Sequence, residues 1–166
     1  MNINPIKFFI KRYHSPQLKA YELKYMLNLW IPFLFNRIRI ISINNSFDKI
    51  IVELKYSFLN RNPYKSTWGG SLASIIDPFF PMMMKQNMLK FGIQTNFYTK
   101  AMNIDFIKEA KSNLIFTFSF SKEEILQAKK NLINDGKFQH WYDVQGIDTM
   151  NNICVKGKVQ VYLKKR

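Results

Sequence analysis

The feature that most constrains the fold is an apolar stretch at residues 71–84, which is long enough for a helix buried inside a domain. The sequence before it, Thr67-Trp68-Gly69-Gly70, has the composition of a loop that leads into a helix. Apart from one insertion, the chain after it contains only strand-length segments rich in β-branched and aromatic residues. These segments are residues 91–98, 101–108, 113–120, 138–148 and 153–163. The order predicts an α+β fold in which an antiparallel β-sheet wraps around a long central helix.

The insertion is predicted to be a surface helix at about residues 121–136. Ser121 and Glu124 have the spacing of a capping box, and Gly136 supplies an end signal. Ile125 and Leu132 give the segment one apolar face, so we expect it to pack at the edge of the core.

A helix is also predicted near the N-terminus, at residues 15–35. Leu18, Tyr21, Tyr25 (or Leu23) and Leu29 recur there at near-helical spacing. A proline inside the pattern, Pro32, predicts a bend in the aromatic segment 30–35. We expect this amphipathic helix to pack on the domain, with anchoring to a membrane surface as the alternative.

Two strands joined by a turn are predicted between these helices. Residues 37–46 alternate polar and apolar side chains, and a second run places Val52, Leu54, Tyr56 and Phe58 on one face. The turn is predicted at residues 44–46, and the central helix is predicted to kink at Pro78.

The length of 166 residues fits a single domain. Residues 1–36 would form an N-terminal helical segment and residues 37–166 the core, since neither a repeat nor a linker interrupts the pattern. No segment reaches the roughly 20 apolar residues of a membrane-spanning helix, and the apolar stretch near Ile6 is too short for a signal peptide. We therefore predict a cytoplasmic protein.

The formal net charge of +14 would by itself suggest a nucleic-acid or membrane partner. However, the basic residues are scattered among Ile, Asn and Phe, and no basic run is longer than the terminal Lys164-Lys165-Arg166. A concentrated basic footprint is what nucleic-acid binding requires, so no nucleic-acid partner is expected.

Metal and disulfide chemistry are not predicted. His14 and His140 are isolated and lack metal-ligand spacing. The single cysteine, Cys154, excludes an intramolecular disulfide and lies in an alternating segment, where the usual role is that of a small buried hydrophobe.

The candidate site is centred on Asp77, a carboxylate within the apolar stretch. On a helix, Gly70, Ser74 and Asp77 would share one narrow face lined by small residues. The start of the helix supplies free N–H groups and a positive dipole end, and Gly69 and Gly70 allow a carbonyl to approach the backbone closely. This combination fits an oxyanion hole for acyl transfer. A capping turn with one satisfied core aspartate is the alternative.

The stretch from Trp68 to Asp77 resembles the hotdog acyl-CoA thioesterases related to the phenylacetate-degradation enzymes. Those enzymes carry His-Gly-Gly and then an acidic residue at the spacing seen here, together with a downstream strand similar to residues 102–108. The resemblance implies that Asp77 acts as nucleophile or general base on a thioester. Trp68 stands where the family has its histidine, which removes an imidazole that could polarise a carbonyl or bind a phosphopantetheine group.

From about Leu29 to the C-terminus the chain also resembles an uncharacterised bacterial hotdog family, domain of unknown function 4442. The matching elements are Asn60-Arg61-Asn62, Gly69-Gly70-Ser71-Leu72, Asp77-Pro78-Phe79 and residues 104–108. Membership would imply a helix wrapped by an antiparallel sheet, dimerisation and a thioesterase-like pocket.

Five further residues are candidates for the site, Asn62 for catalysis and the other four for substrate contact. Asn62 could orient water or substrate, although an asparagine in such a loop is also a common turn residue. Trp68 and Ser74 would border the catalytic face. Phe79 and Met83 would line an acyl pocket, with core packing as the alternative reading of these side chains.

The leading hypothesis is a thioesterase that hydrolyses a fatty-acyl or aromatic-acyl thioester of coenzyme A or an acyl carrier protein. It needs no metal or separate cofactor, since coenzyme A would be part of the substrate. A non-catalytic acyl-CoA or lipid-binding hotdog protein is the alternative, and a basic RNA- or membrane-surface-binding protein is the third option. We expect a homodimer, which could pair further into a dimer of dimers.

Overall fold

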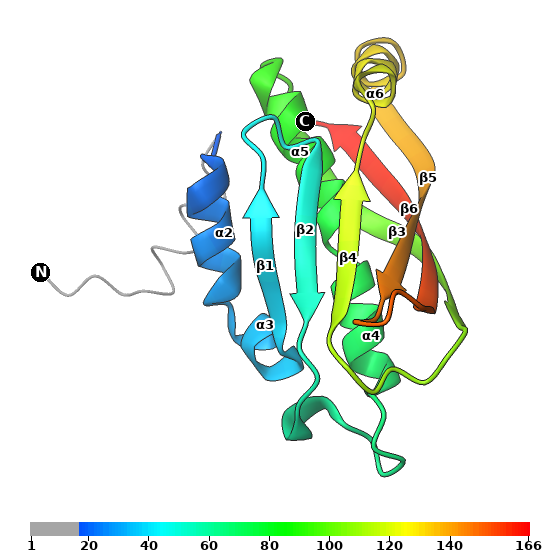
Figure 1. Cartoon of the computed structure of the whole chain (residues 1–166). Coiled ribbons are helices and arrows are strands. Elements are labelled where there is room, and N and C mark those ends of the chain that lie inside the picture. The colour runs from blue at the N-terminus through cyan, green and yellow to red at the C-terminus, as the bar shows by residue number, and fades with distance from the viewer. Residues whose placement is uncertain (1–16) are drawn as a thin grey trace, which may run out of the picture.

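The structure, a computed structural model, describes residues 17–166. Its centre is a six-stranded sheet in which all the pairs of neighbouring strands are antiparallel, in the order β1-β2-β4-β5-β6-β3 (Figure 1). The strands are β1 (Ile38–Ile43), β2 (Lys49–Leu54), β3 (Thr95–Phe106), β4 (Leu114–Ser119), β5 (Lys137–Ile147) and β6 (Ile153–Lys165). The helices are α2 (Ala20–Asn28), α3 (Ile31–Asn36), the 3-10 turn η1 (Phe58–Asn60), α4 (Gly69–Ile76), α5 (Phe79–Lys90) and α6 (Lys122–Asn134).

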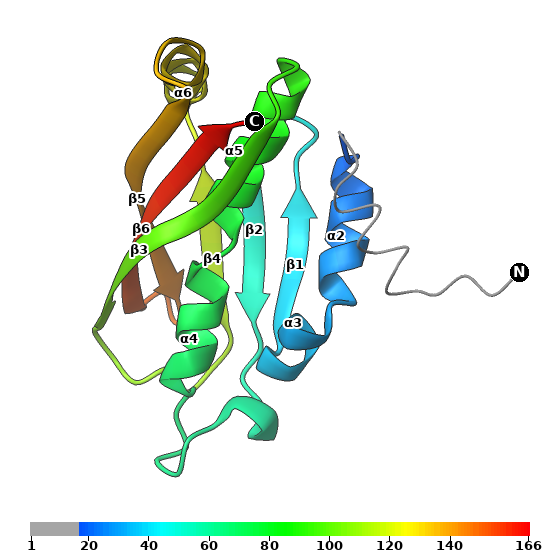
Figure 2. The same cartoon turned by 180° about the vertical axis from the view of Figure 1, so that it is seen from behind.

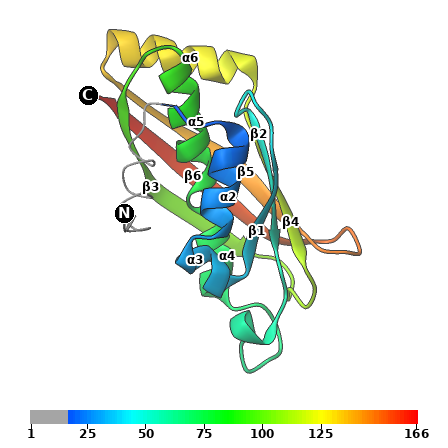
Figure 3. The same ribbon diagram turned by 90° about the vertical axis from the view of Figure 1, so that its left-hand side faces the viewer.

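The sheet curls around α4 and α5, which lie between β3 on one side and β1 and β2 on the other (Figures 2 and 3). Aromatic rings join this helical layer to the sheet, because Phe79 and Phe80 pack on Phe118 of β4 at centroid distances of 4.8 and 5.1 Å. At α4 the approach is close enough to require a glycine: a Cβ on Gly157 of β6 would lie 2.8 Å from a methyl carbon of Ile76. Glycine at this position therefore helps to set how closely α4 packs on the sheet.

The predicted single central helix is divided in the structure. α4 ends at Ile76 and α5 begins at Phe79, with Asp77 and Pro78 between them. Pro78 has no N–H to donate to the carbonyl of Ser74, so the regular hydrogen-bond ladder cannot run through this point. Where a kink at Pro78 was expected, one helix therefore ends and a second helix begins.

The N-terminal helix packs through a face that matches the prediction in part. Leu18 and the alternative position Leu23 are buried, as is Leu27, whereas Tyr21, Tyr25 and Leu29 are exposed. Both faces of this helix are apolar, so periodicity alone did not identify the packed one. The expected bend is present, because α2 ends before Trp30 and a second helix, α3, contains Pro32. The predicted helix start at Ser15 lies outside the described residues.

The predicted strands are recovered, with two corrections. β2 ends at Leu54, so Tyr56 lies beyond the strand and Phe58 begins η1. The segments 91–98 and 101–108 form one strand, β3, whose register shifts between Thr99 and Ala101. Such a bulge lets a strand continue past an irregular residue. The inserted helix is confirmed as α6, with Ser121 and Glu124 forming the expected capping box.

None of the helices built from residues 17–166 is both long enough and apolar enough to cross a membrane.

Candidate active site

The start of α4 is held by a buried asparagine, Asn60, whose side chain is 2% exposed. Its Nδ2 donates to the backbone carbonyls of Asn36 and Lys55, at 3.1 and 2.9 Å, and its Oδ1 accepts from the N–H of Ser57. Its own carbonyl accepts from the N–H of Trp68, the residue that precedes α4, at 2.8 Å. Asn60 therefore connects the end of α3, the end of β2 and the entry to α4.

The sequence analysis did not single out Asn60 as a site residue, although it belongs to the motif Asn60-Arg61-Asn62. Its partners are distant in sequence, so only the motif itself could have drawn attention to it. A second bond at the same place joins Ser71 Oγ to Asn36 Oδ1 at 2.8 Å. Together these contacts fix where the first turn of α4 lies.

Two backbone donors are free at this helix start. Among the described residues, the N–H groups of Gly69 and Gly70 have no hydrogen-bond acceptor, whereas those of Ser71 and Leu72 bond to the carbonyl of Trp68. A free pair of N–H groups at the positive end of a helix can bind an anion or a polarised carbonyl oxygen. The first turn of α4 has the donors that an oxyanion hole requires.

The indole of Trp68 lies against Gly70. A Cβ on Gly70 would be 2.3–2.6 Å from three indole carbons, so a larger residue at this position would force the ring away. Trp68 is nevertheless 57% exposed. The ring therefore occupies part of the corner in which the thioesterases that the sequence resembles have a histidine.

Asp77 is exposed at the opposite end of α4. Its apolar neighbours predicted a buried carboxylate, but Asp77 is exposed at the end of α4. No hydrogen bond or ion pair in residues 17–166 engages its carboxylate, while its backbone carbonyl accepts from Thr99 Oγ1 at 2.9 Å. The carboxylate is thus open to a ligand or to a second molecule.

Strand β3 approaches α4 at both ends of the helix. A Cβ on Gly69 would lie 3.4 Å from the ring of Phe106, at one end, and Thr99 bonds to Asp77 at the other. Met102 and Ile104, between them, are only partly buried. β3 is the last strand of the sheet and pairs with β6 alone among the described strands. The face formed by α4 and β3 is therefore open on its outer side.

Asn62 and Ser74 are engaged locally. The side chain of Asn62 donates to Ser66 Oγ at 2.7 Å and accepts from the N–H of Ser66, which closes the loop between η1 and α4. Ser74 Oγ donates to the carbonyl of Gly70, four residues earlier in the same helix, at 2.8 Å. Neither of these hydrogen-bonding arrangements places the side chain of Asn62 or Ser74 against the carboxylate of Asp77.

Phe79 and Met83 lie in the hydrophobic core and are 0% exposed. Phe79 packs between Phe33 and Phe118, with centroid distances of 5.6 and 4.8 Å. Neither residue lines either of the two cavities described next, so in the single chain both act as packing residues.

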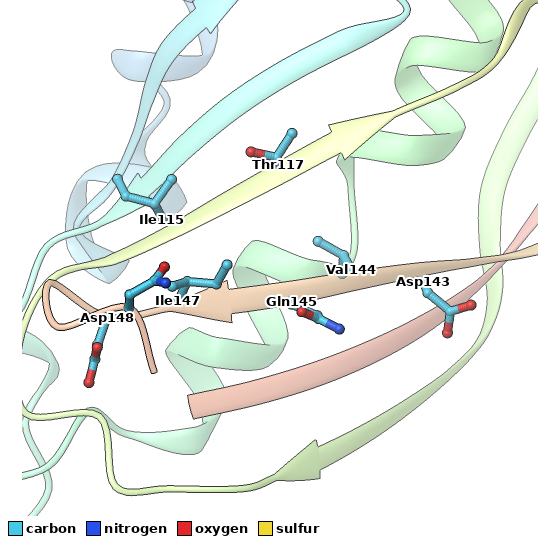
Figure 4. Close-up of a pocket in the computed structure, with 8 residues that line it drawn as sticks. Ile115, Thr117, Asp143, Val144, Gln145, Ile147 and Asp148 are labelled. Carbon is cyan, nitrogen blue, oxygen red and sulfur yellow. The ribbon is translucent and has the colours of Figure 1, made fainter. Parts of the chain in front are cut away.

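Two cavities on the surface of the described residues contain no predicted site residue. The larger, of about 540 Å³, lies where β4 and β5 diverge after two paired positions (Figure 4). Exposed residues such as Thr117, Asp143 and Gln145 line it. The smaller, of about 210 Å³, lies beside β1 and is lined by Asn28, Leu34, Arg37, Ile38, Arg39 and Lys55. The chemistry predicted at α4 is carried by an open surface rather than by an enclosed pocket.

Several titratable groups outside α4 have shifted pKa values. Burial lowers the pKa of Lys85 on α5 and raises the pKa of Tyr142 on β5. Hydrogen bonds led by the backbone N–H of Asn152 lower the pKa of Asp148 in the turn between β5 and β6. None of these three groups was predicted as a site residue. Within the described part of the chain, no group of three or more His, Cys, Asp or Glu side chains could hold a metal ion.

The family described as a domain of unknown function (DUF4442) matches residues 22–163. The chain belongs to this family. A search of curated proteins by sequence finds no significant match. The resemblance stated from the sequence is confirmed, because the match includes α4, Asp77 and β3.

Solved structures share the fold at low sequence identity. A protein of unknown function from Pseudomonas aeruginosa, described as a probable thioesterase, is 15% identical, covers 92% of this chain and all of its own, and has a TM-score of 0.75. The Escherichia coli PaaI protein of the phenylacetic acid degradation operon is 18% identical, covers 89% of this chain and 95% of its own, and has a TM-score of 0.60. A Haemophilus influenzae thioesterase is 8% identical, covers 90% of this chain and 92% of its own, and has a TM-score of 0.63. The predicted α+β fold with an antiparallel sheet is therefore confirmed, and it is the fold that these proteins share.

Proposed function

We propose that the protein hydrolyses an acyl thioester, with a fatty or aromatic acyl group carried on coenzyme A or on an acyl carrier protein. The observation that carries the proposal is the presence of an unengaged carboxylate, Asp77, and of the unbonded N–H groups of Gly69 and Gly70 at the two ends of a partly exposed helix. A base and an oxyanion donor are the two groups that acyl transfer to water needs. Neither a metal nor a cofactor of its own is required.

In the proposed reaction, Asp77 removes a proton from a water molecule whose oxygen attacks the thioester carbon. The charge that develops on the carbonyl oxygen is stabilised by the N–H groups of Gly69 or Gly70. The C–S bond then breaks, and the sulfur leaves as a thiolate or takes the proton held by Asp77. Direct attack by the Asp77 carboxylate, followed by hydrolysis of the anhydride, uses the same groups.

The Asp77 carboxylate and the N–H group of Gly70 that act on one thioester cannot come from the same α4 helix. Gly70 and Asp77 are seven residues apart, which corresponds to about 10 Å at 1.5 Å per residue. Each must lie about 3 Å from atoms of the same reacting group. We therefore propose a homodimer in which Asp77 of one chain faces Gly70 of the other. A two-fold axis that pairs the outer edges of two β3 strands would bring the two α4 helices together and form two equivalent sites.

The experiment that tests hydrolysis is a screen of acyl-CoA substrates of different chain length, including aromatic acyl groups. We expect Asp77→Ala to lower turnover by about 10²–10⁴-fold, as loss of a general base does. Asp143→Ala is the matched control, because Asp143 is also an exposed carboxylate but lies on β5. Equal loss in both variants, or no loss in Asp77→Ala, would remove Asp77 from the mechanism.

The shared site has a separate test. Asp77→Ala subunits and Gly70→Pro subunits should each be inactive, since the second substitution removes one N–H donor. When the two are mixed and exchange subunits, some heterodimers keep one intact site, so part of the activity should return. Verified heterodimers without recovery would mean that each subunit works alone or that Gly70 is not a donor.

A second candidate function is the binding of an acyl-CoA or lipid without hydrolysis. The position of the Trp68 ring against Gly70 favours it, because the ring occupies space that a thioester carbonyl would need. In this case the wild type would bind acyl-CoA without turnover, and Trp68→His would produce activity that depends on Asp77. Turnover by the wild type that survives Trp68→Ala would exclude this candidate.

A further inference from the structure

An apolar surface extends from α3 to η1 on the side of the molecule that carries β1. Its large side chains are 45–76% exposed and belong to α3, η1 and the two residues between α2 and α3. α3 and η1 contact each other, which places their exposed side chains on neighbouring elements. We call Leu29, Trp30, Ile31, Leu34, Phe35 and Phe58 the α3 patch. Single exposed hydrophobic residues are common, but a contiguous group of this kind marks an interaction site.

The apolar surface continues onto α2, the helix that precedes the α3 patch. Tyr21 and Tyr25 lie on the outer face of α2, opposite the buried Leu23 and Leu27. Figure 3 shows α2 and α3 facing the viewer, with neither of them covered by another labelled element. The apolar outer face therefore spans two consecutive helices.

Basic side chains outnumber acidic ones around the patch, where Glu22 of α2 and Glu53 of β2 are the nearby carboxylates. Residues 23–47 and 54–76, which form most of α2, all of α3 and β1, η1 and α4, contain no Asp or Glu. The same two segments contain Lys24, Arg37, Arg39, Lys55, Arg61 and Lys65. Glu53 lies opposite Arg39 in the β1–β2 pair and accepts a hydrogen bond from Asn113 at 2.9 Å. A partner with negative charge and an apolar interior complements this surface.

Three of these basic side chains line one cavity next to the patch. Arg37, Arg39 and Lys55 line the cavity of about 210 Å³, and Leu34 of the α3 patch lines it as well. Nε of Arg37 is buried and has no hydrogen-bond partner among residues 17–166. A buried guanidinium donor without an acceptor is costly, and a phosphate oxygen would satisfy it.

We propose that this surface binds an anionic lipid bilayer, with the α3 patch entering the interface and the cavity of Arg37, Arg39 and Lys55 receiving a lipid phosphate. Helices with an apolar outer face and flanking cations bind membranes in this orientation. The proposal is independent of hydrolysis. It also fits the proposed dimer, because β1 and β3 are at opposite ends of the strand order and the surface stays free when β3 is paired.

Nucleic acid would also attract the cations, but it accounts less well for the patch. Bases stack on aromatic rings, whereas Leu29, Ile31 and Leu34 are aliphatic and offer no stacking face. An acyl-chain region accepts aliphatic and aromatic side chains alike. RNA binding is therefore treated as an outcome of the test.

The test measures how the full chain distributes between buffer and sedimented vesicles. Vesicles of neutral phosphatidylcholine are compared with vesicles that contain about one third phosphatidylglycerol, and we expect at least about 10-fold stronger binding to the anionic ones. Phe35→Ser combined with Phe58→Ser should weaken that binding by about 10-fold or more, since two exposed rings no longer enter the interface. Arg39→Gln combined with Arg61→Gln should weaken anionic binding by about 10-fold and leave neutral binding unchanged.

The matched control is Leu126→Ser combined with Ile133→Ser on α6. These side chains are 56% and 55% exposed, so the change in exposed apolar surface is similar, but they belong to a different helix. This control should bind vesicles like the wild type. All the substituted residues are exposed, and matching thermal unfolding curves would verify that each variant is folded.

Four outcomes would overturn the proposal. The wild type could fail to bind vesicles, could bind neutral and anionic vesicles equally, or could bind as well after the Phe35 and Phe58 substitutions. The fourth outcome combines two observations: the wild type does not bind vesicles, and changing Phe35 and Phe58 lowers the molecular mass measured by light scattering. That result would identify the patch as a contact between copies of the chain. Binding of single-stranded RNA in place of vesicles would assign the cations to nucleic acid.

Discussion

The two edges of the sheet differ in how their backbone is covered. At β1 the edge is closed from within the chain: Asn28 of α2 donates to the carbonyl of Ile40 at 3.1 Å and accepts from its N–H at 2.7 Å, as a neighbouring strand would. Lys24 Nζ adds a bond to the carbonyl of Ile41 at 2.7 Å. β3, at the other edge, is twice as long, with 12 residues against 6, and pairs with β6 only.

The difference indicates which edge is available for assembly. Exposed edge strands tend to associate, and proteins usually shorten, charge or cover them. β1 is short and covered by a helix, whereas β3 presents Tyr98 and Phe106 to solvent. The open edge also borders Asp77 and the first turn of α4, where we propose that two chains share a site. Closing one edge and leaving the other open permits a closed dimer rather than a continuous sheet of many chains.

The largest predicted effect comes from placing a charge at the open edge. Phe106→Glu should weaken dimerisation by about 100-fold, equivalent to about 3 kcal/mol, because burying an unpaired carboxylate in an interface is unfavourable. The folded monomer should tolerate the change, since Phe106 is 60% exposed. Sedimentation velocity over a concentration series measures the dissociation constant, and the hydrolytic activity should fall with the dimer.

Ile41→Glu is the matched control at the closed edge. Ile41 is also an exposed apolar strand residue, but it lies on β1 beside Lys24. This variant should keep the wild-type dissociation constant. A dimer that survives Phe106→Glu and dissociates in Ile41→Glu would reverse the assignment of the two edges.

Local signals in the sequence were sufficient for the type of most elements and for α6, whose capping box requires only Ser121 and Glu124. They were insufficient where two solutions satisfy the same pattern. Tyr21 and Tyr25 are as periodic as Leu23 and Leu27, and only the packing against β1 decides between the two faces. Long-range contacts such as those of Asn60 leave no periodic signal at all.

The candidate site shows the same limit. The motif located Gly69, Gly70 and Asp77 on one segment, and the structure places them at the two ends of α4. Apolar neighbours suggested a buried Asp77, yet its exposure depends on where Pro78 breaks the helix. Burial of Phe79 and Met83 in the core could not be separated from a role in a pocket, because both roles favour the same side chains.

An effect of intermediate size on the unfolding free energy is expected when the hydrogen bonds that cover the β1 edge are removed. Asn28→Ala removes both hydrogen bonds to Ile40 and leaves its backbone groups without those partners, which should cost about 1–3 kcal/mol of unfolding free energy. Urea unfolding followed by circular dichroism measures the loss. Asn134→Ala is the matched control, because Asn134 also ends a helix but its side chain makes no hydrogen bond among the described residues. Equal destabilisation in both would show that Asn28 acts through its own helix instead of through β1.

The smallest predicted effect concerns Lys24. Its ammonium group bonds to the carbonyl of Ile41, but water can replace this contact, so Lys24→Met should change the unfolding free energy by only about 0.5 kcal/mol. The informative variant combines Lys24→Met and Asn28→Ala with Phe106→Glu. In this chain the β3 edge is blocked and the β1 edge has lost its side-chain covers, so any association seen in sedimentation must use a newly exposed surface. We expect weak, concentration-dependent association that is absent when Phe106→Glu is made alone. If the combined variant stays monomeric at every concentration tested, the helix backbone of α2 is enough to shield β1, and its side-chain hydrogen bonds contribute stability without preventing association.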